Sequence, residues 1–328
     1  SKNINDLNIK RTLNLMKNRG PDCQKFKSQD INNNRVLFLH SRLSIIDLDE
    51  RSNQPFEKDD LIIIFNGEIY NFLEIKKKLI KQGHTFRTNS DTEDIIEAYK
   101  KYREKCVNIF EGMWAFAILD KKKQTVFFSR DRFGEKPLYL LEIGGEIYFG
   151  SETKFIFSLL GKQVDLNYDK ISKFLVCGFR ALFKERSSFF SGIRELPPST
   201  NLIVKNNFQK KEYKYWSLNY RPQRVNEIEV YEKIEELLFN SVKLRLRSDI
   251  PLAFCLSGGI DSSSLVAITK NIINSKIQTF SIIDSDQRYN ESENIKEIVS
   301  FIKCENTIIS TSRNDFLNNM EKIISYYS

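Results

Sequence analysis

The spacing of hydrophobic residues changes about two-thirds of the way along the chain, and this change constrains the fold more than any other feature. Before it, short apolar or alternating runs are separated by polar turns, which is typical of β-strands. These runs cover residues 35–46, 61–65, 113–119, 124–130, 137–142 and 146–151. Amphipathic patterns predict helices at about 71–82 and 91–103, the second opening with Ser90 and Glu93 at capping-box spacing. Strands in runs with inserted helices predict a layered α+β domain.

Beyond a polar, linker-like segment at 219–227, apolar residues recur at helical spacing from Ile228, and strands then alternate with helices. The expected elements are a buried strand at 250–256, a helix from about Asp261, a strand at 277–283, a helix near 292–302, a strand at 307–310 and a helix from about Asp315. This order predicts an α/β domain with a doubly wound parallel sheet. A chain of 328 residues is long for one core, so we expect two domains, 1–218 and 226–328.

Composition narrows the class of protein. Hydrophobic residues make up 41% and charged residues 29% of the chain, which is typical of a soluble globular protein. The apolar runs are too short to span a bilayer, and no secretory signal is visible, so we expect a cytoplasmic protein without membrane contact. The net charge of +8 is spread in short runs, which does not favour nucleic-acid binding. Five cysteines and two histidines without ligand spacing do not favour a zinc site.

Residues 256–263 read Leu-Ser-Gly-Gly-Ile-Asp-Ser-Ser and lie between the predicted buried strand and a helix. Glycines let the backbone approach an anion closely, and the helix start offers unpaired N–H groups. Ser257, Ser262 and Ser263 add hydroxyl donors. Asp261 would repel a phosphate unless it holds Mg²⁺ or caps the helix. The alternative is an ordinary glycine turn with a helix cap.

This segment resembles the pyrophosphate loop of the ATP pyrophosphatases, which activate a carboxylate or carbonyl group as an adenylate. It lacks the Gly-Lys-Ser/Thr of a P-loop and is not a GxGxxG fingerprint. The resemblance implies that ATP and Mg²⁺ are bound here, with Asp261 as the Mg²⁺ ligand. The ATP-binding positions it implies are Leu256, Ser257, Gly258, Gly259, Asp261, Ser262 and, at the end of the next strand, Ile282.

Six further motifs occur in order in the first two-thirds of the chain. They are Arg19-Gly20-Pro21-Asp22, Arg42-Leu43-Ser44-Ile45-Ile46, Gln54-Pro55, Phe65-Asn66-Gly67-Glu68-Ile69-Tyr70-Asn71, Ser90-Asp91-Thr92-Glu93 and the segment 130–139 that begins Arg-Asp-Arg-Phe-Gly. Together they resemble the N-terminal-nucleophile glutaminase domain of B-type, glutamine-hydrolysing asparagine synthetases, which are class II glutamine amidotransferases. With Ser-Asp-Ile-Pro at 248–251, the resemblance covers nearly the whole chain. It implies an αββα sandwich followed by the ATP-pyrophosphatase domain.

The resemblance also implies a glutamine site. Its residues would be Arg42, Leu43, Ser44, Ile45, Ile46, Asn66, Gly67, Glu68 and Asp91. Arg42 could bind the carboxylate of glutamine with two bonds, and Asp91 and Glu68 could hold its ammonium group. The Asn66 side chain and the Gly67 N–H match the family's oxyanion hole. Taken alone, each has an ordinary structural interpretation: a hairpin turn at Asn66-Gly67, a surface ion pair for Arg42 and a helix cap for Asp91.

The nucleophile is not among the matched residues. In the family it is a cysteine directly after the initiator methionine, and its own α-amino group is the base. Here residue 1 is Ser and the Arg-Gly-Pro-Asp motif comes early, so we expect the family's opening strand to be missing and the chain to be truncated at both ends. Cys23 cannot be N-terminal and is expected to be structural. Asn18 replaces the family's usual His, without an assignable role.

The resemblance implies a ligase with two reactions: glutamine is hydrolysed to ammonia, and aspartate is adenylated by ATP and converted to asparagine with release of AMP and pyrophosphate. One alternative is a related amidotransferase that acts on a sugar or peptide carboxylate. Another is a β-lactam synthetase-like protein that has lost glutaminase activity, which the intact set of Arg42, Asn66, Gly67 and Asp91 does not favour. A third is a catalytically inactive binding protein, if the nucleophile is truly absent. The sequence does not decide which acceptor is used. It does not decide the oligomeric state either, and it is compatible with a homodimer.

Overall fold

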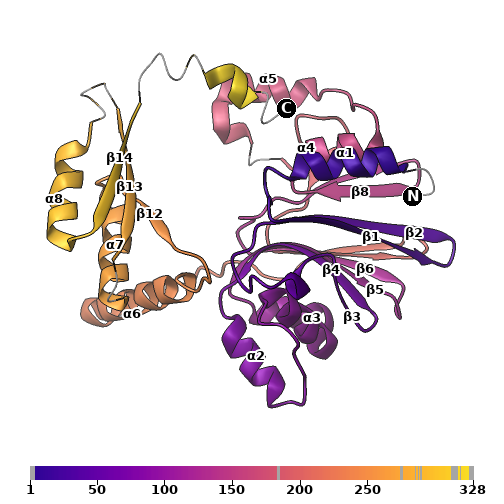
Figure 1. Cartoon of the computed structure of the whole chain (residues 1–328), viewed down its shortest axis with the longest axis horizontal. Helices are drawn as coiled ribbons and strands as arrows, with labels where there is room; N and C mark the ends of the chain where they lie inside the picture. Colours follow the sequence, from indigo (N-terminus) through magenta and orange to yellow (C-terminus); the bar gives the residue numbers. More distant parts are fainter. Residues whose placement is uncertain are drawn as a thin grey trace. The chain divides into compact units, whose positions relative to one another are not determined.

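The computed structural model of the chain describes residues 4–182, 185–273, 276–284, 286, 288, 290–311, 317 and 319–324. It divides into two compact units, Ser1–Tyr220 and Arg221–Ser328 (Figure 1). Each unit has its own hydrophobic core. Ser1, which stands at the position where the sequence analysis looked for the nucleophile, lies outside the described residues.

The first unit is built on a six-stranded sheet in the order β11-β10-β6-β5-β4-β3. Every neighbouring pair in it is antiparallel. The strands are β3 (Phe56–Lys58), β4 (Leu61–Ile69), β5 (Gly112–Asp120), β6 (Thr125–Arg130), β10 (Thr200–Lys205) and β11 (Lys210–Lys214). Predicted strands at 61–65, 113–119 and 124–130 are therefore present, and β4 continues through Asn66 and Gly67.

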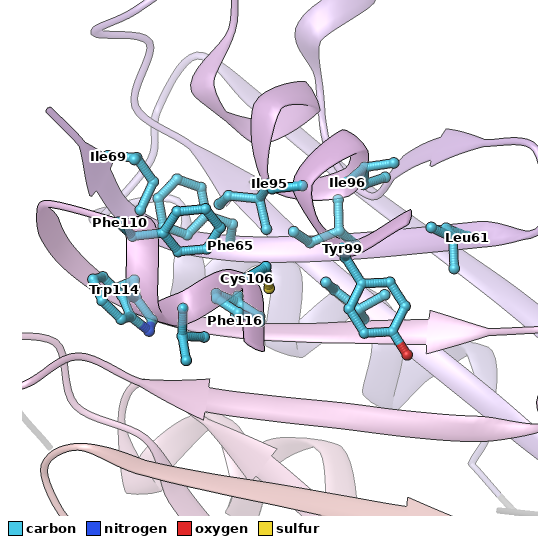
Figure 2. Close-up of a cluster of buried hydrophobic side chains, with 14 of the residues drawn as sticks. Leu61, Phe65, Ile69, Ile95, Ile96, Tyr99, Cys106, Phe110, Trp114 and Phe116 are labelled. Carbon is cyan, nitrogen blue, oxygen red and sulfur yellow. The ribbon is translucent and has the colours of Figure 1, made fainter. Parts of the chain in front are cut away.

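Side chains alternate between the two faces of this sheet, as strand geometry requires. On one face, α2 (Phe72–Ile80) and α3 (Asp91–Tyr102) cover a core that contains Phe65, Ile69 and Trp114. Figure 2 shows Ile95 and Ile96 of α3 lying over the strand that carries Phe65. Even-numbered residues of β4 therefore point to the opposite face.

A second β layer covers that opposite face. It consists of the hairpin β1 (Cys23–Ile31) and β2 (Asn34–Arg42), and of a three-stranded sheet in the order β8-β7-β9. The strands of that sheet are β7 (Tyr139–Ile143), β8 (Glu146–Gly150) and β9 (Ile193–Glu195). Among the described residues, β2 and β8 each lie at the end of their sheet.

Helices pack outside the second β layer. They are α1 (Asp6–Met16) and α4 (Thr153–Leu160), which contact each other, while α5 (Tyr168–Cys177) follows in the chain (Figure 1). Short 3₁₀ helices lie at Glu50–Ser52, Arg103–Ile109 and Gly178–Ala181. The first unit therefore has four layers: α2 and α3, the six-stranded sheet, the second β layer, and the outer helices. This order confirms the predicted αββα sandwich.

The second unit contains a parallel sheet in the order β12-β13-β14, which confirms the predicted α/β class. Its strands are β12 (Ala253–Cys255), β13 (Gln278–Asp284) and β14 (Glu305–Thr311), and its helices are α6 (Glu227–Arg245), α7 (Ile260–Ile272) and α8 (Ser292–Ile302). Leu256, Val266, Ile277 and Ile295 form its core. The predicted start of a helix at Asp315 lies outside the described residues, while 319–324 are helical.

One expectation for the second unit was wrong. The predicted buried strand at 250–256 is only three residues long, and both Ala253 and Cys255 are exposed. The helical spacing near Ile228 does give α6, but Ile228 and Tyr231 are 67% and 62% exposed. A hydrophobic period predicts which face a helix would bury, and burial itself depends on a partner element.

The capping box predicted for α3 forms only in half. The Ser90 hydroxyl accepts the Thr92 N–H, with an oxygen–nitrogen distance of 3.2 Å. Glu93 does not return to Ser90, because its carboxylate accepts the N–H groups of Arg87 (3.1 Å) and Thr88 (2.7 Å) instead. The loop before α3 therefore takes the Glu93 carboxylate. The start of α3 is fixed by the Ser90 cap and by the bonds from Glu93 to this loop.

No described helix is long and apolar enough to cross a membrane.

Candidate functional site

A cavity of about 420 Å³ lies between the two β layers of the first unit. Strand alternation brings polar side chains to it: on β4, Ile62 is followed at even positions by Asn66 and Glu68, and on β2, Phe38 is followed by His40 and Arg42. Eight of the nine predicted glutamine-binding residues line the cavity, namely Arg42, Leu43, Ile45, Ile46, Asn66, Gly67, Glu68 and Asp91. Ser44 is not among the lining residues, and its N–H donates to the Asp22 carboxylate at 2.7 Å.

Asn66 and Gly67 lie inside β4, so the hairpin-turn interpretation of this pair is wrong. The Asn66 amide donates to the Ser151 hydroxyl at 3.0 Å, which uses one of its two hydrogens. Gly67 has a φ of 149°, and a Cβ there would lie 2.0 Å from the Met113 carbonyl oxygen. Only glycine fits this position, because β5 passes directly against it.

Arg42 is buried and its guanidinium group holds the loop that follows β2. Nη1 donates to the Asp49 carbonyl and to the Asn53 side chain, both at 3.0 Å. Nη2 donates to the carbonyls of Ile46 (3.2 Å) and Asp47. The surface ion-pair interpretation is therefore wrong. A two-pronged bond to a substrate carboxylate would have to replace some of these four bonds, which the sequence did not reveal.

Asp91 and Glu68 place two carboxyl groups at the cavity. Asp91 is the first residue of α3, and its Oδ2 accepts the Ile69 N–H at 2.9 Å. Burial raises the pKa of Asp91 to about 7; the bond from Ile69 lowers this pKa and the Glu68 charge raises it. Burial also raises the pKa of Glu68, with Lys136 acting against it. An ammonium group of a ligand would favour the charged form of both carboxyl groups and so lower their pKa values. The pair therefore suits the cationic end of a substrate.

Sequence reasoning missed several polar residues that line the same cavity, among them His40, Gln54 and Ser151. Gln54 Oε1 accepts the Phe65 N–H at 2.6 Å, and His40 Nε2 lies 3.2 Å from the Phe65 carbonyl oxygen. His40 could have been predicted from the sequence, because it lies two residues before Arg42 and so shares the same face of the strand. Gln54 belonged to a quoted motif, but nothing in the motif indicated its partner.

None of the five cysteines lines the cavity. Cys23 begins β1 and is half-buried. Asn18 lies exposed in the turn after α1 and is also absent from the lining. None of these five thiols is therefore placed to act inside this cavity.

The second candidate site is the loop before α7. The Ser257 and Ser262 hydroxyls lie 3.1 Å apart, and the Ser257 N–H donates to Ser262 Oγ at 3.2 Å. Gly258 has a φ of 84°, and a Cβ there would come within 3.1 Å of Asn294. Gly259 is the residue before the helix. The loop is thus closed by its own hydroxyls at a helix start, where N–H groups and the helix dipole favour an anion.

The flanking positions differ in exposure. Leu256 is buried in the core, so only its backbone borders the loop, whereas Ile282 is 68% exposed on β13. Asp261 lies exposed in the first turn of α7. The described residues contain no group of three side chains that could hold a metal ion by themselves. One carboxylate together with phosphate oxygens is an arrangement that suits Mg²⁺, so Asp261 fits that ion only alongside a nucleotide.

Comparison with known proteins decides the family. Residues 1–216 match the family model of the glutamine amidotransferase domain. The chain belongs to that family. Residues 233–328 of this amidotransferase chain match the asparagine synthase model.

Relatives extend over most of the amidotransferase chain. It is 35% identical, over 98% of its length, to a Methanocaldococcus jannaschii protein assigned to the glutamine-hydrolysing asparagine synthetases, and 32% identical over 97% to asparagine synthetase [glutamine-hydrolyzing] 1 of Bacillus subtilis. It is also 31% identical, over 81%, to amidase chry2 of Gibberella zeae. The chain spans only 65%, 49% and 39% of these three relatives.

Proposed function

We propose that this chain carries the glutaminase site and the first nucleotide loop of a glutamine-hydrolysing asparagine synthetase, a ligase. The observation that supports this most is the convergence of Arg42, Asn66, Gly67, Glu68 and Asp91 on one cavity. An amino acid with a carboxylate, an ammonium group and a cleavable amide needs a cation, anions and aimed N–H donors, and the cavity lining contains all three.

In the proposed glutaminase reaction, Asp91 and Glu68 bind the ammonium group of glutamine, and Arg42 faces its carboxylate. Attack of a thiolate on the side-chain amide gives a tetrahedral oxyanion. The Asn66 amide and the Gly67 N–H donate to that oxygen, and the intermediate collapses to a thioester with release of ammonia. Water then hydrolyses the thioester to glutamate.

We infer that the thiol enters on an additional strand between β2 and β8. Both strands are edges among the described residues, and both line the cavity. The lining of the cavity between these two strands includes the apolar side chains of Val36 and Phe38 on β2 and of Phe149 on β8. An extended segment with alternating apolar residues would satisfy both edges and fill this part of the cavity. Its first residue would then supply both thiol and amine.

A glutamine analogue with an electrophilic side chain tests this inference in the full-length protein. We expect it to label a cysteine other than Cys23, Cys106, Cys177, Cys255 and Cys304, as read by peptide mass spectrometry. Labelling of one of these five, blocked by glutamine, would overturn the additional strand.

For the second reaction, we propose that the backbone N–H groups of Gly258 and Gly259 and the start of α7 bind the phosphates of ATP, with Ile282 beside the adenine. Asp261 would hold Mg²⁺, which supplies charge neutralisation between the phosphates. The acceptor carboxylate, which we take to be that of aspartate, attacks the α-phosphate and releases pyrophosphate. Ammonia from the first site then attacks the acyl-adenylate and releases AMP.

The full-length protein tests the whole proposal when it is supplied with [amide-¹⁵N]glutamine, aspartate and Mg-ATP. We expect ¹⁵N in the side chain of asparagine and one AMP per asparagine. Similarity to amidase chry2 makes an acceptor other than aspartate the second candidate. Labelled product only from a sugar or peptide carboxylate would support that candidate, and ligand binding without turnover would indicate a binding protein.

A further inference from the structure

β4, the strand that carries Asn66 and Gly67, loses its neighbour β3 on one side before it reaches these two residues, while β5 stays paired on the other side. β3 pairs with β4 only as far as Phe56 opposite Ile63, so Phe65 lies beyond the last paired residue. In a strand, the N–H and C=O of every second residue point to the same side. The backbone groups of Phe65, Gly67 and Ile69 therefore all point to this open edge.

Side chains take the place of the absent strand at this edge. Gln54 Oε1 accepts the Phe65 N–H at 2.6 Å, and the His40 ring lies 3.2 Å from the Phe65 carbonyl oxygen. Two residues further on, Asp91 accepts the Ile69 N–H at 2.9 Å. Strand alternation predicts that the Gly67 N–H, between these two fixed points, is directed to the same edge. Its direction is thus set by bonds on either side.

The tautomer of His40 follows from its partner. A carbonyl oxygen can only accept a hydrogen bond, so Nε2 of His40 must carry the proton. Nδ1 is then an acceptor; it is enclosed and has no partner among the described residues. Burial lowers the pKa of His40 to about 4, although the Phe65 bond raises it, and the Arg42 charge lowers it further. The ring is therefore neutral and in one tautomer at physiological pH.

We propose that His40 and Gln54 are positioning residues of the glutaminase site: they bind the C=O and the N–H of Phe65, one on each side of its Cα, and so keep Asn66 and Gly67 aimed at the oxyanion. Neither side chain needs to touch the reacting amide. This inference rests on the proposed glutaminase function. It goes beyond it, because neither the fold nor the motif requires side chains to replace a strand here.

We call the two bonds from His40 and Gln54 to Phe65 the clamp. Kinetics of the full-length protein test it. We expect His40→Leu to lower kcat for glutamine hydrolysis about 10- to 100-fold, because small displacements of oxyanion donors cost that much. KM for glutamine should change less than about threefold, since the substrate contacts are made elsewhere. His40→Gln retains an N–H at similar reach and should recover most of the loss. Gln54→Leu should resemble His40→Leu, and ammonia-dependent synthesis should be unchanged in all three.

His84→Leu is the matched control. His84 pairs with Glu97 at 2.6 Å and does not line the cavity, so its loss should leave glutamine hydrolysis unchanged. If the wild-type protein hydrolyses glutamine and His40→Leu does so equally well, the clamp is wrong. The clamp is also wrong if His40→Gln is as slow as His40→Leu. If the wild-type protein shows no hydrolysis, the proposed function fails instead.

A measurement on the 328-residue chain tests the clamp without turnover. The chain has two histidines, so ¹⁵N spectra of the imidazole rings are simple to assign with His84→Leu. We expect His40 to carry its proton on Nε2 and to have a bare Nδ1 at neutral pH. A proton on Nδ1 would rule out donation to Phe65 and overturn the proposal.

Discussion

The glutamine cavity and the nucleotide loop are built in opposite ways. The cavity takes its polar residues from β2, β4 and the start of α3, with Ser151 after β8, and most of their groups are already bonded. The loop is one strand–turn–helix segment of consecutive residues, closed by bonds between its own serines. The first is pre-organised by packing between layers and the second by its local backbone. Damage to one should therefore leave the other intact, and the predictions below test that separation.

The largest effect is expected from Asn66→Ala in the full-length protein. Loss of one oxyanion donor typically lowers kcat about 10²- to 10³-fold, so glutamine hydrolysis should fall by that factor. Ammonia-dependent synthesis, assayed in parallel, should stay within about twofold of the wild type. An equal fall in both activities would contradict the separation of the two sites.

Gly67→Ala is a poorer test of the oxyanion hole than Asn66→Ala. Its added methyl group would collide with the Met113 carbonyl on β5, so the strand pairing itself would have to shift. Loss of activity in that variant would not separate chemistry from folding.

Gly258→Ala reverses the pattern. The φ of 84° is unfavourable for alanine, and the new Cβ would press against Asn294. We expect ATP affinity to fall at least about tenfold, with glutamine hydrolysis retained. Gly259→Ala is the matched control, because its φ is −74° and its added Cβ would meet only Ser257 Oγ at 3.4 Å. Equal losses in the two variants, measured by calorimetric titration with Mg-ATP, would refute the role of backbone conformation.

Protonation of Asp91 should make glutamine binding depend on pH. Its pKa of about 7 means that the carboxylate form, which attracts an ammonium group, declines as the pH falls below 7. KM for glutamine should therefore rise, by up to about tenfold per pH unit, between pH 7 and pH 5. Asp91→Asn should raise KM at neutral pH and remove this dependence. A wild-type KM that is flat over this range would argue against Asp91 as the ammonium ligand.

The smallest effect concerns stability. Both carboxyl oxygens of Asp94 are buried without a partner among the described residues, and burial raises its pKa from 3.8 to about 8. Lys76 opposes this shift, while Asp91, Glu93 and Glu97 add to it. Because the folded state prefers the protonated form, the contribution of Asp94 to stability is complete below about pH 4 and is lost as pH rises to about 8.

Asp94→Asn should therefore stabilise the protein at pH 8 by about 1–3 kcal/mol, since it removes a buried charge that has no hydrogen-bond partner among the described residues. Thermal unfolding of the 328-residue chain measures this, with exposed Asp30→Asn as the control. A destabilised Asp94→Asn at pH 8 would mean that the carboxylate has a favourable partner.

Much of both sites could be predicted from the sequence, for different reasons. The loop was found because all its determinants are consecutive. The cavity residues were found because motifs on β2, β4 and α3 matched a family pattern, and strand alternation sent Asn66 and Glu68 to one face. The bonds of Arg42 could not be predicted, because they depend on how the loop after β2 folds back. The clamp by Gln54 was hidden as well, since Gln54 lies just before β3 begins, where β3 no longer pairs with β4.

Glycine-labelled NMR tests the assignment of two separate sites most directly. The chain has 13 glycines, so [¹⁵N]glycine labelling gives few signals, with Gly67 in the cavity and Gly258 and Gly259 in the loop. Glutamine should shift the Gly67 signal and leave those of Gly258 and Gly259 unchanged, and Mg-ATP should do the reverse. A glutamine-induced shift at Gly258 and Gly259 with Gly67 unmoved would contradict the account.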